Sequence, residues 1–311
     1  MSHSDFRIEF GGDHLLPAFC AGFNTGFSDY KYGIQMDEAQ MVQFLAHSGI
    51  DLEHSAVLLQ QNGAGWHGAG VALVAVMDGE AWCSGLAVAP ALRGAGFGRR
   101  LMEAVQANAT AAGAHTLRLE VLVNNAPARQ LYTALGYQPQ RELIFWRTEA
   151  PAAPRADVAE LHAANVAAAL AGAYAWQAVS PAWQRRQRTV ALQRDALWAY
   201  SFQDGGEIAG WIISQPTASH SPGGHLRQRI VALAVRPGDQ RPLLAHRLLA
   251  SLRAHQPNTV FSVINEPVES IFTPALRDNG FVEMDRQIEM VLPLYDAERV
   301  TKGRSSNSPD V

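Results

Sequence analysis

The sequence of 311 residues lacks several features that mark particular classes of protein. Two cysteines are too few for a disulfide scaffold or a cysteine metal cluster. No apolar run approaches the roughly 18 residues of a membrane span, and no signal-type apolar core follows Met1–Asp5. The net charge is −4, and no basic block is present. We therefore expect a cytoplasmic protein that binds neither nucleic acid nor a membrane.

Metal binding is not expected either, because the histidines are spaced unlike metal ligands. What the sequence does contain is a composition typical of globular proteins. Hydrophobic residues make up 48% and charged residues 17% of the chain, which is long enough for two ordinary domains.

The stretch from Gly85 to Gly98 predicts a strand, a tight loop and a helix. Leu86–Val88 is an apolar run that Pro90 ends, and Leu101 and Val105 follow at helical spacing. A helix N-terminus gathers unpaired main-chain N–H groups and the positive end of the helix dipole, which suits a phosphate. Taken alone, this pattern also fits a plain tight connection.

The loop residues themselves favour the phosphate interpretation. Gly94, Gly96 and Gly98 remove Cβ atoms where a diphosphate would approach the main chain, and Arg93 adds a charged donor. The glycines are spaced by one residue, which excludes the dinucleotide fingerprint, and the Gly-Lys-Ser/Thr ending of a Walker loop is missing.

Two motifs in order resemble those of the GNAT (general-control-related N-acetyltransferase) superfamily. Arg93–Gly98 resembles its acetyl-CoA pyrophosphate loop, Arg/Gln-x-x-Gly-x-Gly/Ala. Asn125–Tyr137 follows the strand Leu117–Val123 and is similar to the superfamily's Asn-x-x-Ala-x-x-Leu-Tyr-x-x-x-Gly-Phe/Tyr signature. The resemblance implies that acetyl-CoA is the co-substrate. Its implied contacts are Leu86, Ala87, Val88, Arg93, Gly94, Ala95, Gly96, Phe97, Gly98, Arg99, Asn125, Ala128 and Tyr132.

The resemblance also implies catalytic residues. Tyr132 stands at the motif position of the tyrosine that lies beside the CoA sulfur, and we expect it to protonate the departing thiolate. Glu120 occupies a position that resembles the general base of the ribosomal-protein alanine acetyltransferases. Alternatively, Tyr132 is a packing residue, and Glu120 is a strand carboxylate paired with Arg118 or Arg141. Glu80 acting through water remains another candidate base.

The turn-rich segment between the first two predicted helices, 14–23 and 37–47, is the candidate acceptor site. Phe27, Asp29 and Tyr30 offer aromatic walls and one carboxylate for a cation. We expect an acetyltransferase that acts on an amine of a small molecule or peptide by direct attack in a ternary complex. The alternative is an acetyl-CoA-binding regulatory module without transfer activity.

The element order predicted for the first half, β-α-α-β-β-β-α-β-α-β, recurs in the second half. We therefore expect a mixed α/β fold with a catalytic domain at 1–149, a linker at 150–156, a degenerate GNAT-like domain at 157–295 and a disordered tail at 296–311. The second domain is expected to begin with an alanine-rich helix over 158–173. Such a chain is expected to be a monomer resembling an internal dimer, or a weak homodimer.

The second copy lacks the chemistry of the first. A constant shift of 147 places Leu243 where the first copy has Gly96. Further along, a shift of 140 matches Asn265 with Asn125, and places Phe272 at Tyr132 and Val260 at Glu120. We therefore expect one acetyl-CoA site per chain.

Overall fold

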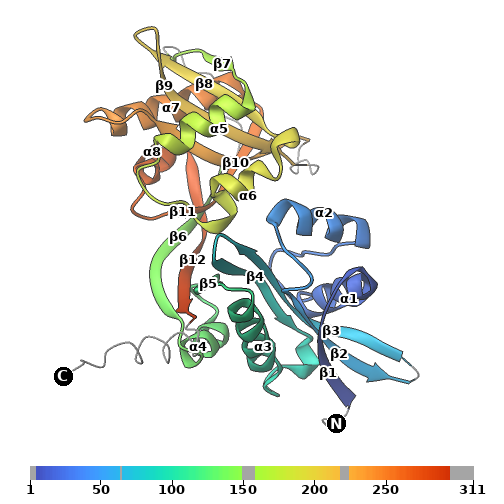
Figure 1. Cartoon of the computed structure of the whole chain (residues 1–311). Helices are drawn as coiled ribbons and strands as arrows, with labels where there is room; N and C mark the ends of the chain where they lie inside the picture. Colours follow the sequence, from blue (N-terminus) through green and yellow to red (C-terminus); the bar gives the residue numbers. More distant parts are fainter. Residues whose placement is uncertain (1–4, 64, 149–157, 218–223, 295–311) are drawn as a thin grey trace, which may run out of the picture. The chain divides into compact units, whose positions relative to one another are not determined.

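The computed structural model describes residues 5–63, 65–148, 158–217 and 224–294 (Figure 1). The chain forms two compact units, Met1–Gln140 with Glu289–Val311, and Arg141–Ile288. Both units combine a mixed sheet with helices, which confirms the predicted fold class. The predicted linker at 150–156 and tail at 296–311 lie outside the described residues.

In the first unit the strands lie in the order β1-β2-β3-β4-β5. The element order predicted for this half is confirmed. The strands are β1 (Phe6–Phe10), β2 (Ala56–Asn62), β3 (Gly65–Met77), β4 (Glu80–Val88) and β5 (Thr116–Leu122). The helices are α1 (Leu16–Gly26), α2 (Glu38–Ser48), α3 (Phe97–Ala111) and α4 (Ala126–Ala134), with short 3-10 turns η2 (Asp13–Leu15) and η3 (Pro90–Leu92).

The second unit repeats this order, with β12 beside β6 and then β11-β10-β9-β8-β7. Its strands are β6 (Gln138–Thr148), β7 (Leu161–Ala163), β8 (Trp198–Asp204), β9 (Glu207–Pro216), β10 (Leu226–Val235), β11 (Thr259–Pro267) and β12 (Phe281–Pro293). Its helices are α5 (Val166–Ala175), α6 (Gln187–Ala191), α7 (Arg241–His255) and α8 (Phe272–Asp278), with 3-10 turns η4 (Trp183–Arg185) and η5 (Arg194–Ala196).

The predicted helix over 158–173 is wrong in its first half. Leu161–Ala163 forms β7, which pairs antiparallel with β8. α5 begins only at Val166, because the side chain of Asn165 accepts hydrogen bonds from the N–H groups of Ala167 and Ala168. The alanine-rich composition indicated a helix, and the capping asparagine sets where it begins.

The outlines of the two units also differ from the predicted domains, because most of β6 and the end of β12 belong to the unit of the other repeat. Most of β6 belongs to the second unit, where it pairs antiparallel with β11. The end of β12, from Glu289, belongs to the first unit, where the N–H of Leu294 donates to the carbonyl of His115 at 2.8 Å. A strand pattern alone does not say which of two similar sheets the strand joins.

In the first unit, α1 packs against the sheet through glycines on both surfaces. A Cβ atom on Gly68 would lie 1.9 Å from the carbonyl oxygen of Ala18, and one on Gly22 would lie 2.9 Å from that of Gly70. A Cβ atom on Gly26 would lie 2.6 Å from that of Ala87 on β4. The helix therefore approaches β3 and β4 more closely than side chains would allow.

We predict that Gly68→Ala lowers the free energy of unfolding by about 1–3 kcal/mol, because the added methyl group overlaps the main chain of α1. Gly12→Ala is the matched control, since a Cβ atom there has nothing within 4 Å and the residue has a φ of −77°. It should change stability by less than about 0.5 kcal/mol. Urea unfolding measures both, and equal stabilities of the two variants would contradict the close packing.

Candidate active site

A glycine loop joins β4 to α3 in the first unit. Gly94 and Gly96 have φ values of 80° and 85°, in the left-handed region that favours glycine, and Gly96 is the N-cap of α3. A Cβ atom on either glycine would have nothing within 4 Å, so the loop faces open space. The N–H groups of the first helical turn have no acceptor within the helix and point out of its end. This arrangement suits a phosphate group.

The neighbouring strands β4 and β5 part just before this loop. Their parallel pairing covers Glu80–Cys83 and Thr116–Leu119 and, among the described residues, goes no further. Ser84 forms a bulge in the pairing of β4 with β3, since Gly85 pairs with Leu73 and Cys83 with Val74. The rest of β4, with Leu86, therefore presents main-chain groups at an opening between the two strands.

Tyr132 of α4 lies at one face of this opening. Only 7% of the residue is exposed, and its ring makes an edge contact with that of Tyr137 at 5.7 Å. Burial raises the pKa of Tyr132 well above its usual value of 10, with a smaller contribution from the neighbouring Cys83. The phenol is thus held in its protonated, hydrogen-bond-donating form.

Glu120 of β5 lies against Trp82 of β4. The indole Nε1 donates to the Glu120 carboxylate at 2.8 Å. Arg118 does not stay available as the ion-pair partner proposed for Glu120, because its Nη2 lies 2.8 Å from Glu80 and its Nε also donates there. Glu80, the other candidate base, is thus paired with Arg118. Trp82 was not predicted to contact Glu120, and its place opposite Arg118 follows only from the strand register.

Tyr132 and Glu120 approach the opening from opposite faces of the sheet. Successive side chains of a strand alternate between faces, so Trp82 and Cys83 point to opposite sides. Trp82 contacts Glu120, whereas the buried Cys83 lies 3.9 Å from the sulfur of Met102 on α3 and is next to Tyr132. Burial raises the pKa of the Cys83 thiol to about 12, so it stays protonated. The opening thus has a carboxylate on one side and a phenol on the other.

The predicted acceptor segment lies on the Glu120 face. A Cβ atom on Gly85 would be 3.4 Å from the Phe27 ring, so this aromatic residue rests directly on the bulged part of β4. The rings of Phe27 and Tyr30 are 5.4 Å apart. Glycine inside a strand is a signal for such a close approach, and it identifies Gly85 as a residue that the motif comparison did not single out.

The structure joins two predicted ligand residues, Arg93 and Asp29, to each other. Nη1 and Nη2 of Arg93 donate to the Asp29 carboxylate at 2.7 and 2.8 Å. Nη2 also donates to the carbonyl of Gly26, and Nε to that of Val88. These bonds use four of the five N–H groups of the guanidinium. Arg93 therefore ties the glycine loop to the end of α1, and Asp29 has a cation partner already.

Other residues predicted to contact acetyl-CoA have packing, capping or surface positions near the loop. The Phe97 ring is buried and lies 4.6 Å from that of Phe6, so only its main chain faces the loop. Asn125 is the N-cap of α4 and accepts from the N–H of Ala128 at 3.3 Å. Arg99 and Glu103 form an exposed pair on α3. Ala87 lies under α1, and exposed Ala95 lies between the two loop glycines.

In the second unit a helical turn replaces the segment that corresponds to the glycine loop. Burial supports the shift of 147 within the helices, since Leu101 and Leu248 are both fully buried. At that shift Phe97 corresponds to residue 244, yet α7 begins three residues earlier, at Arg241. Leu243 therefore lies in the first turn of α7, and it is exposed.

The remaining matches at the shift of 140 are wrong, although their consequence holds. Asn265 lies within β11 rather than capping a helix. α4 and α8 both end just before a glycine followed by an aromatic residue, Tyr137 or Phe281. Counting back five residues from each aromatic residue gives Tyr132 and Leu276, so these two residues correspond. Cys83 pairs with Leu119, and Ile230 pairs with Val263, so Ile264 corresponds to Glu120. Both replacements are apolar.

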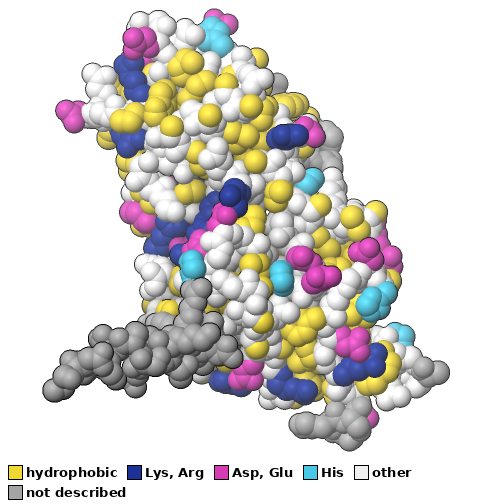
Figure 2. Space-filling model, viewed as in Figure 1, with side chains coloured by type: hydrophobic (Ala, Val, Ile, Leu, Met, Phe, Trp, Pro, Cys, Tyr) yellow, Lys and Arg dark blue, Asp and Glu magenta, His cyan; other side chains and the backbone are white. Residues whose placement is uncertain are grey.

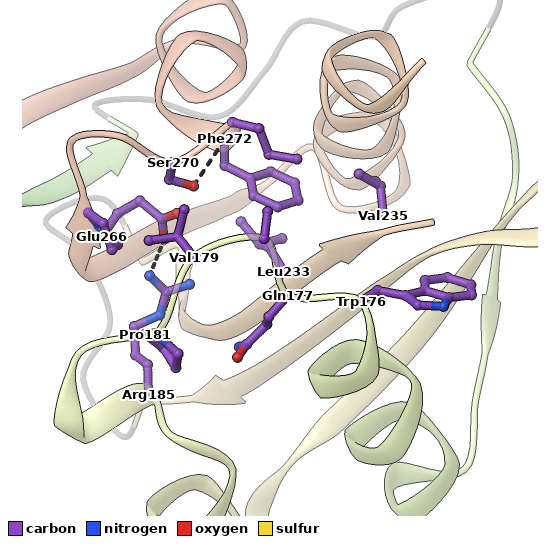
Figure 3. Close-up of a pocket in the computed structure, with 13 residues that line it drawn as sticks. Trp176, Gln177, Val179, Pro181, Arg185, Leu233, Val235, Glu266, Ser270 and Phe272 are labelled. Atoms are coloured by element: carbon purple, nitrogen blue, oxygen red, sulfur yellow. Dashed lines mark hydrogen bonds and ion pairs between the residues drawn. The ribbon is translucent and has the colours of Figure 1, made fainter. Parts of the chain in front are cut away.

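The opening between β10 and β11 is bridged by a side chain of the chain itself. Their pairing ends at Ile230 and Val263 within the described residues. Beyond it, Nε of Arg185 donates to the carbonyl of Val231 on β10 at 3.2 Å, and Nη1 donates to the Glu266 carboxylate on β11 (Figure 3). Arg185 thus bridges the two strands where the first unit has its opening.

Comparison with known proteins identifies the first unit's motifs. The model of the acetyltransferase (GNAT) family matches residues 30–137, which include the glycine loop, Glu120 and the Tyr132 helix. Residues 30–137 therefore resemble a GNAT domain. The family's chemistry is acyl-CoA-dependent N-acyl transfer. No curated protein matches the sequence.

Solved structures share the fold over nearly the whole chain. A GCN5-related N-acetyltransferase from Sphaerobacter thermophilus is 17% identical, with a TM-score of 0.65, over 94% of this chain and 96% of that chain. A tandem GNAT protein from the clavulanic acid biosynthesis pathway is 16% identical, with a TM-score of 0.63, over 94% of this chain and 99% of that chain. A putative acetyltransferase from Pyrococcus horikoshii is 10% identical, with a TM-score of 0.62, over 94% and 91%.

Three further observations concern other classes of site. Among the described residues, no three His, Cys, Asp or Glu side chains are grouped to hold a metal ion. None of the described helices combines the length and apolar character needed to cross a membrane. On the face shown in Figure 2, Lys and Arg side chains lie among Asp and Glu rather than gathering in one large patch. The expectation of no nucleic-acid partner stays a prediction.

We predict that the Asp29–Arg93 pair stabilises the fold in a pH-dependent way. The hydrogen bonds from Arg93 lower the pKa of Asp29 below its usual 3.8, so the contribution is present above that pH and is lost as the pH falls through the folded-state pKa. The difference in unfolding free energy between the wild type and Asp29→Asn should therefore shrink on acidification below about pH 4.

Asp195→Asn is the control, because Asp195 is almost fully exposed and lies 3.7 Å from Arg194. Its difference from the wild type should stay close to zero at every pH. Urea unfolding between pH 3 and pH 6 measures both variants. A pH-independent difference for Asp29→Asn would show that the pair does not form in solution.

Proposed function

We propose that the chain is an N-acetyltransferase that moves the acetyl group of acetyl-CoA to an amine of a small molecule or peptide. The observation that carries this proposal is the opening between β4 and β5, with the glycine loop at its end and Glu120 and Tyr132 on its two faces. The acceptor attacks directly while both substrates are bound, without an acetylated enzyme residue. The protonated, buried Cys83 supports this choice over a cysteine nucleophile.

The first unit has the features that a CoA thioester needs. Gly94, Ala95 and Gly96 present main chain to open space, and the N–H groups of Phe97, Gly98 and Arg99 at the start of α3 receive the diphosphate. Main-chain groups of Leu86 at the opening bind the pantetheine arm. The thioester, when bound, supplies the activated acetyl group. Val88 contributes less than predicted, because its carbonyl accepts from Arg93.

Glu120 and Tyr132 divide the proton transfers between the two faces. Glu120 removes a proton from the acceptor amine on the Phe27 face, and the Trp82 indole orients its carboxylate. Tyr132 donates its proton to the departing sulfur on the α4 face, and its raised pKa keeps that proton in place at neutral pH. This separation keeps base and acid from exchanging the proton with each other.

The acceptor binds against Phe27 and Tyr30, whose rings form the wall next to β4. Asp29 holds this segment in place through its hydrogen bonds with Arg93, and it is not the sole group that binds the amine. We propose that the chain works as a monomer whose second unit is a degenerate repeat. An amine panel scored for CoA release tests the function. Acetyl-CoA binding without turnover on any amine would leave the chain as an acetyl-CoA-binding module.

We predict that one chain binds one acetyl-CoA, and that Gly96→Leu weakens binding at least tenfold, or about 1.4 kcal/mol. Leucine at a φ of 85° is strained, and its side chain fills the space where the diphosphate lies. Gly113→Leu is the matched control, because Gly113 has a φ of 82° and equally open surroundings at the other end of α3. Titration calorimetry measures affinity and stoichiometry. A stoichiometry of two, or equal losses in both variants, would contradict the assignment.

We also predict that Tyr132→Phe lowers turnover by about 10² while acetyl-CoA affinity stays nearly constant, because a general acid acts in the transition state. Glu120→Gln should lower turnover similarly. Tyr137→Phe is the matched control, since Tyr137 packs against Tyr132 and its hydroxyl bonds only loosely to Gln106, at 3.5 Å. Steady-state kinetics with chemistry rate-limiting decides the point. Equal turnover of Tyr132→Phe and Tyr137→Phe would make Tyr132 a packing residue.

A further inference from the structure

The second unit contains a pocket at the place where β10 and β11 part. Its walls come from the ends of both strands, the start of α8 and the segment between α5 and η4. The pocket is partly open to solvent, and its empty space, counted together with that open part, is about 420 Å³. Figure 3 shows Arg185 and Glu266 pointing toward each other on one side of the pocket, with Trp176 on the other.

Arg185 brings an incompletely used guanidinium to this pocket. Its side chain is 9% exposed, Nε donates to Val231, and Nη1 donates to Glu266. Among the residues that the structure describes, none accepts from Nη2. Nη2 is not one of the fully buried polar atoms that lack a partner, and Arg185 lines the pocket. We therefore take this nitrogen to face the pocket. The two N–H groups of Nη2, on a buried cation, are therefore available to donate to a ligand.

Glu266 is the complementary group. Its side chain is 4% exposed, and Oε2 accepts from Arg185. Among the described residues, none donates a hydrogen bond to Oε1. This oxygen is also not one of the fully buried polar atoms that lack a partner. Burying a charged oxygen without a full set of hydrogen bonds is costly, so this atom is an acceptor for a ligand or water in the pocket.

Apart from Gln177 and Ser270, the rest of the lining is apolar. The larger apolar side chains of the lining are those of Trp176, Val179, Leu233, Val235, Ile271 and Phe272. Phe272 and Val235 are buried, so they are fixed parts of the wall. The pocket thus combines one adjacent pair of opposite charges with an apolar compartment.

We propose that this pocket binds a small zwitterion, an α-amino acid with an apolar side chain. Its carboxylate accepts from Nη2 of Arg185, its ammonium group donates to Oε1 of Glu266, and its side chain fills the apolar compartment. A ligand with a single charge would satisfy one group and leave the other incompletely bonded. The site is separate from the proposed acetyl-CoA site, and the proposal does not depend on the transferase function.

The test compares three ligands of the same shape. Phenylalanine carries both charges, 3-phenylpropionate lacks the ammonium group, and phenethylamine lacks the carboxylate. Calorimetry on the full chain should give one site for phenylalanine, at least about tenfold tighter than for either analogue. Equal affinities would overturn the proposal, because the pocket would then be only apolar. Absence of binding by phenylalanine and leucine up to about 1 mM would overturn it as well.

Two variants locate the site. Arg185→Met combined with Glu266→Leu replaces both charges by apolar groups of similar size, which avoids leaving one buried charge unpaired. Val179→Trp keeps the ion pair and fills the pocket. Both should reduce phenylalanine affinity at least about tenfold, with acetyl-CoA affinity and melting temperature as controls for folding. Unchanged phenylalanine binding in the folded Val179→Trp variant would place the ligand elsewhere and overturn the proposal.

Discussion

The parting of two parallel strands is the constraint on which both units depend. Parallel strands that diverge leave main-chain donors and acceptors without their ladder partners, and such groups must find others. In the first unit the pairing of β4 and β5 stops at Cys83 and Leu119. In the second unit the pairing of β10 and β11 stops at the corresponding place, Ile230 and Val263. What fills each opening decides what each unit can do.

The two units resolve this constraint in different ways. In the first, the end of β4 leads into a loop with two glycines in the left-handed region, and Arg93 fixes that loop to the end of α1. In the second unit a buried ion pair joins the diverging strands, since Arg185 bridges Val231 and Glu266. Breaking such a pair by removing one partner is expected to cost about 3–5 kcal/mol. In the second unit a side chain of the chain itself therefore bridges the opening.

Much of the first unit could be predicted from the sequence, because its motifs are local. The glycine spacing at Gly94 and Gly96 and the tyrosine motif need only neighbouring residues to be recognised, and the structure has the glycine loop and the Tyr132 helix in the expected elements. Contacts between distant residues could not be predicted. Arg93 meets Asp29 across 64 positions, and Arg185 meets Glu266 across 81. No periodicity or spacing encodes such pairs.

The repeat illustrates the same limit at the level of elements. A constant shift matched the buried positions of α3 and α7, because burial repeats with the helix, but it did not reveal that α7 begins one turn earlier. That extra turn places Leu243 on a helix, where side chains are tolerated, instead of in a loop that requires glycine. Loss of the glycines and gain of the helical turn are thus one change. In that helical turn no residue needs a left-handed φ, Pro242 has no N–H group to donate, and Leu243 adds a side chain, so nothing in the segment favours keeping glycine.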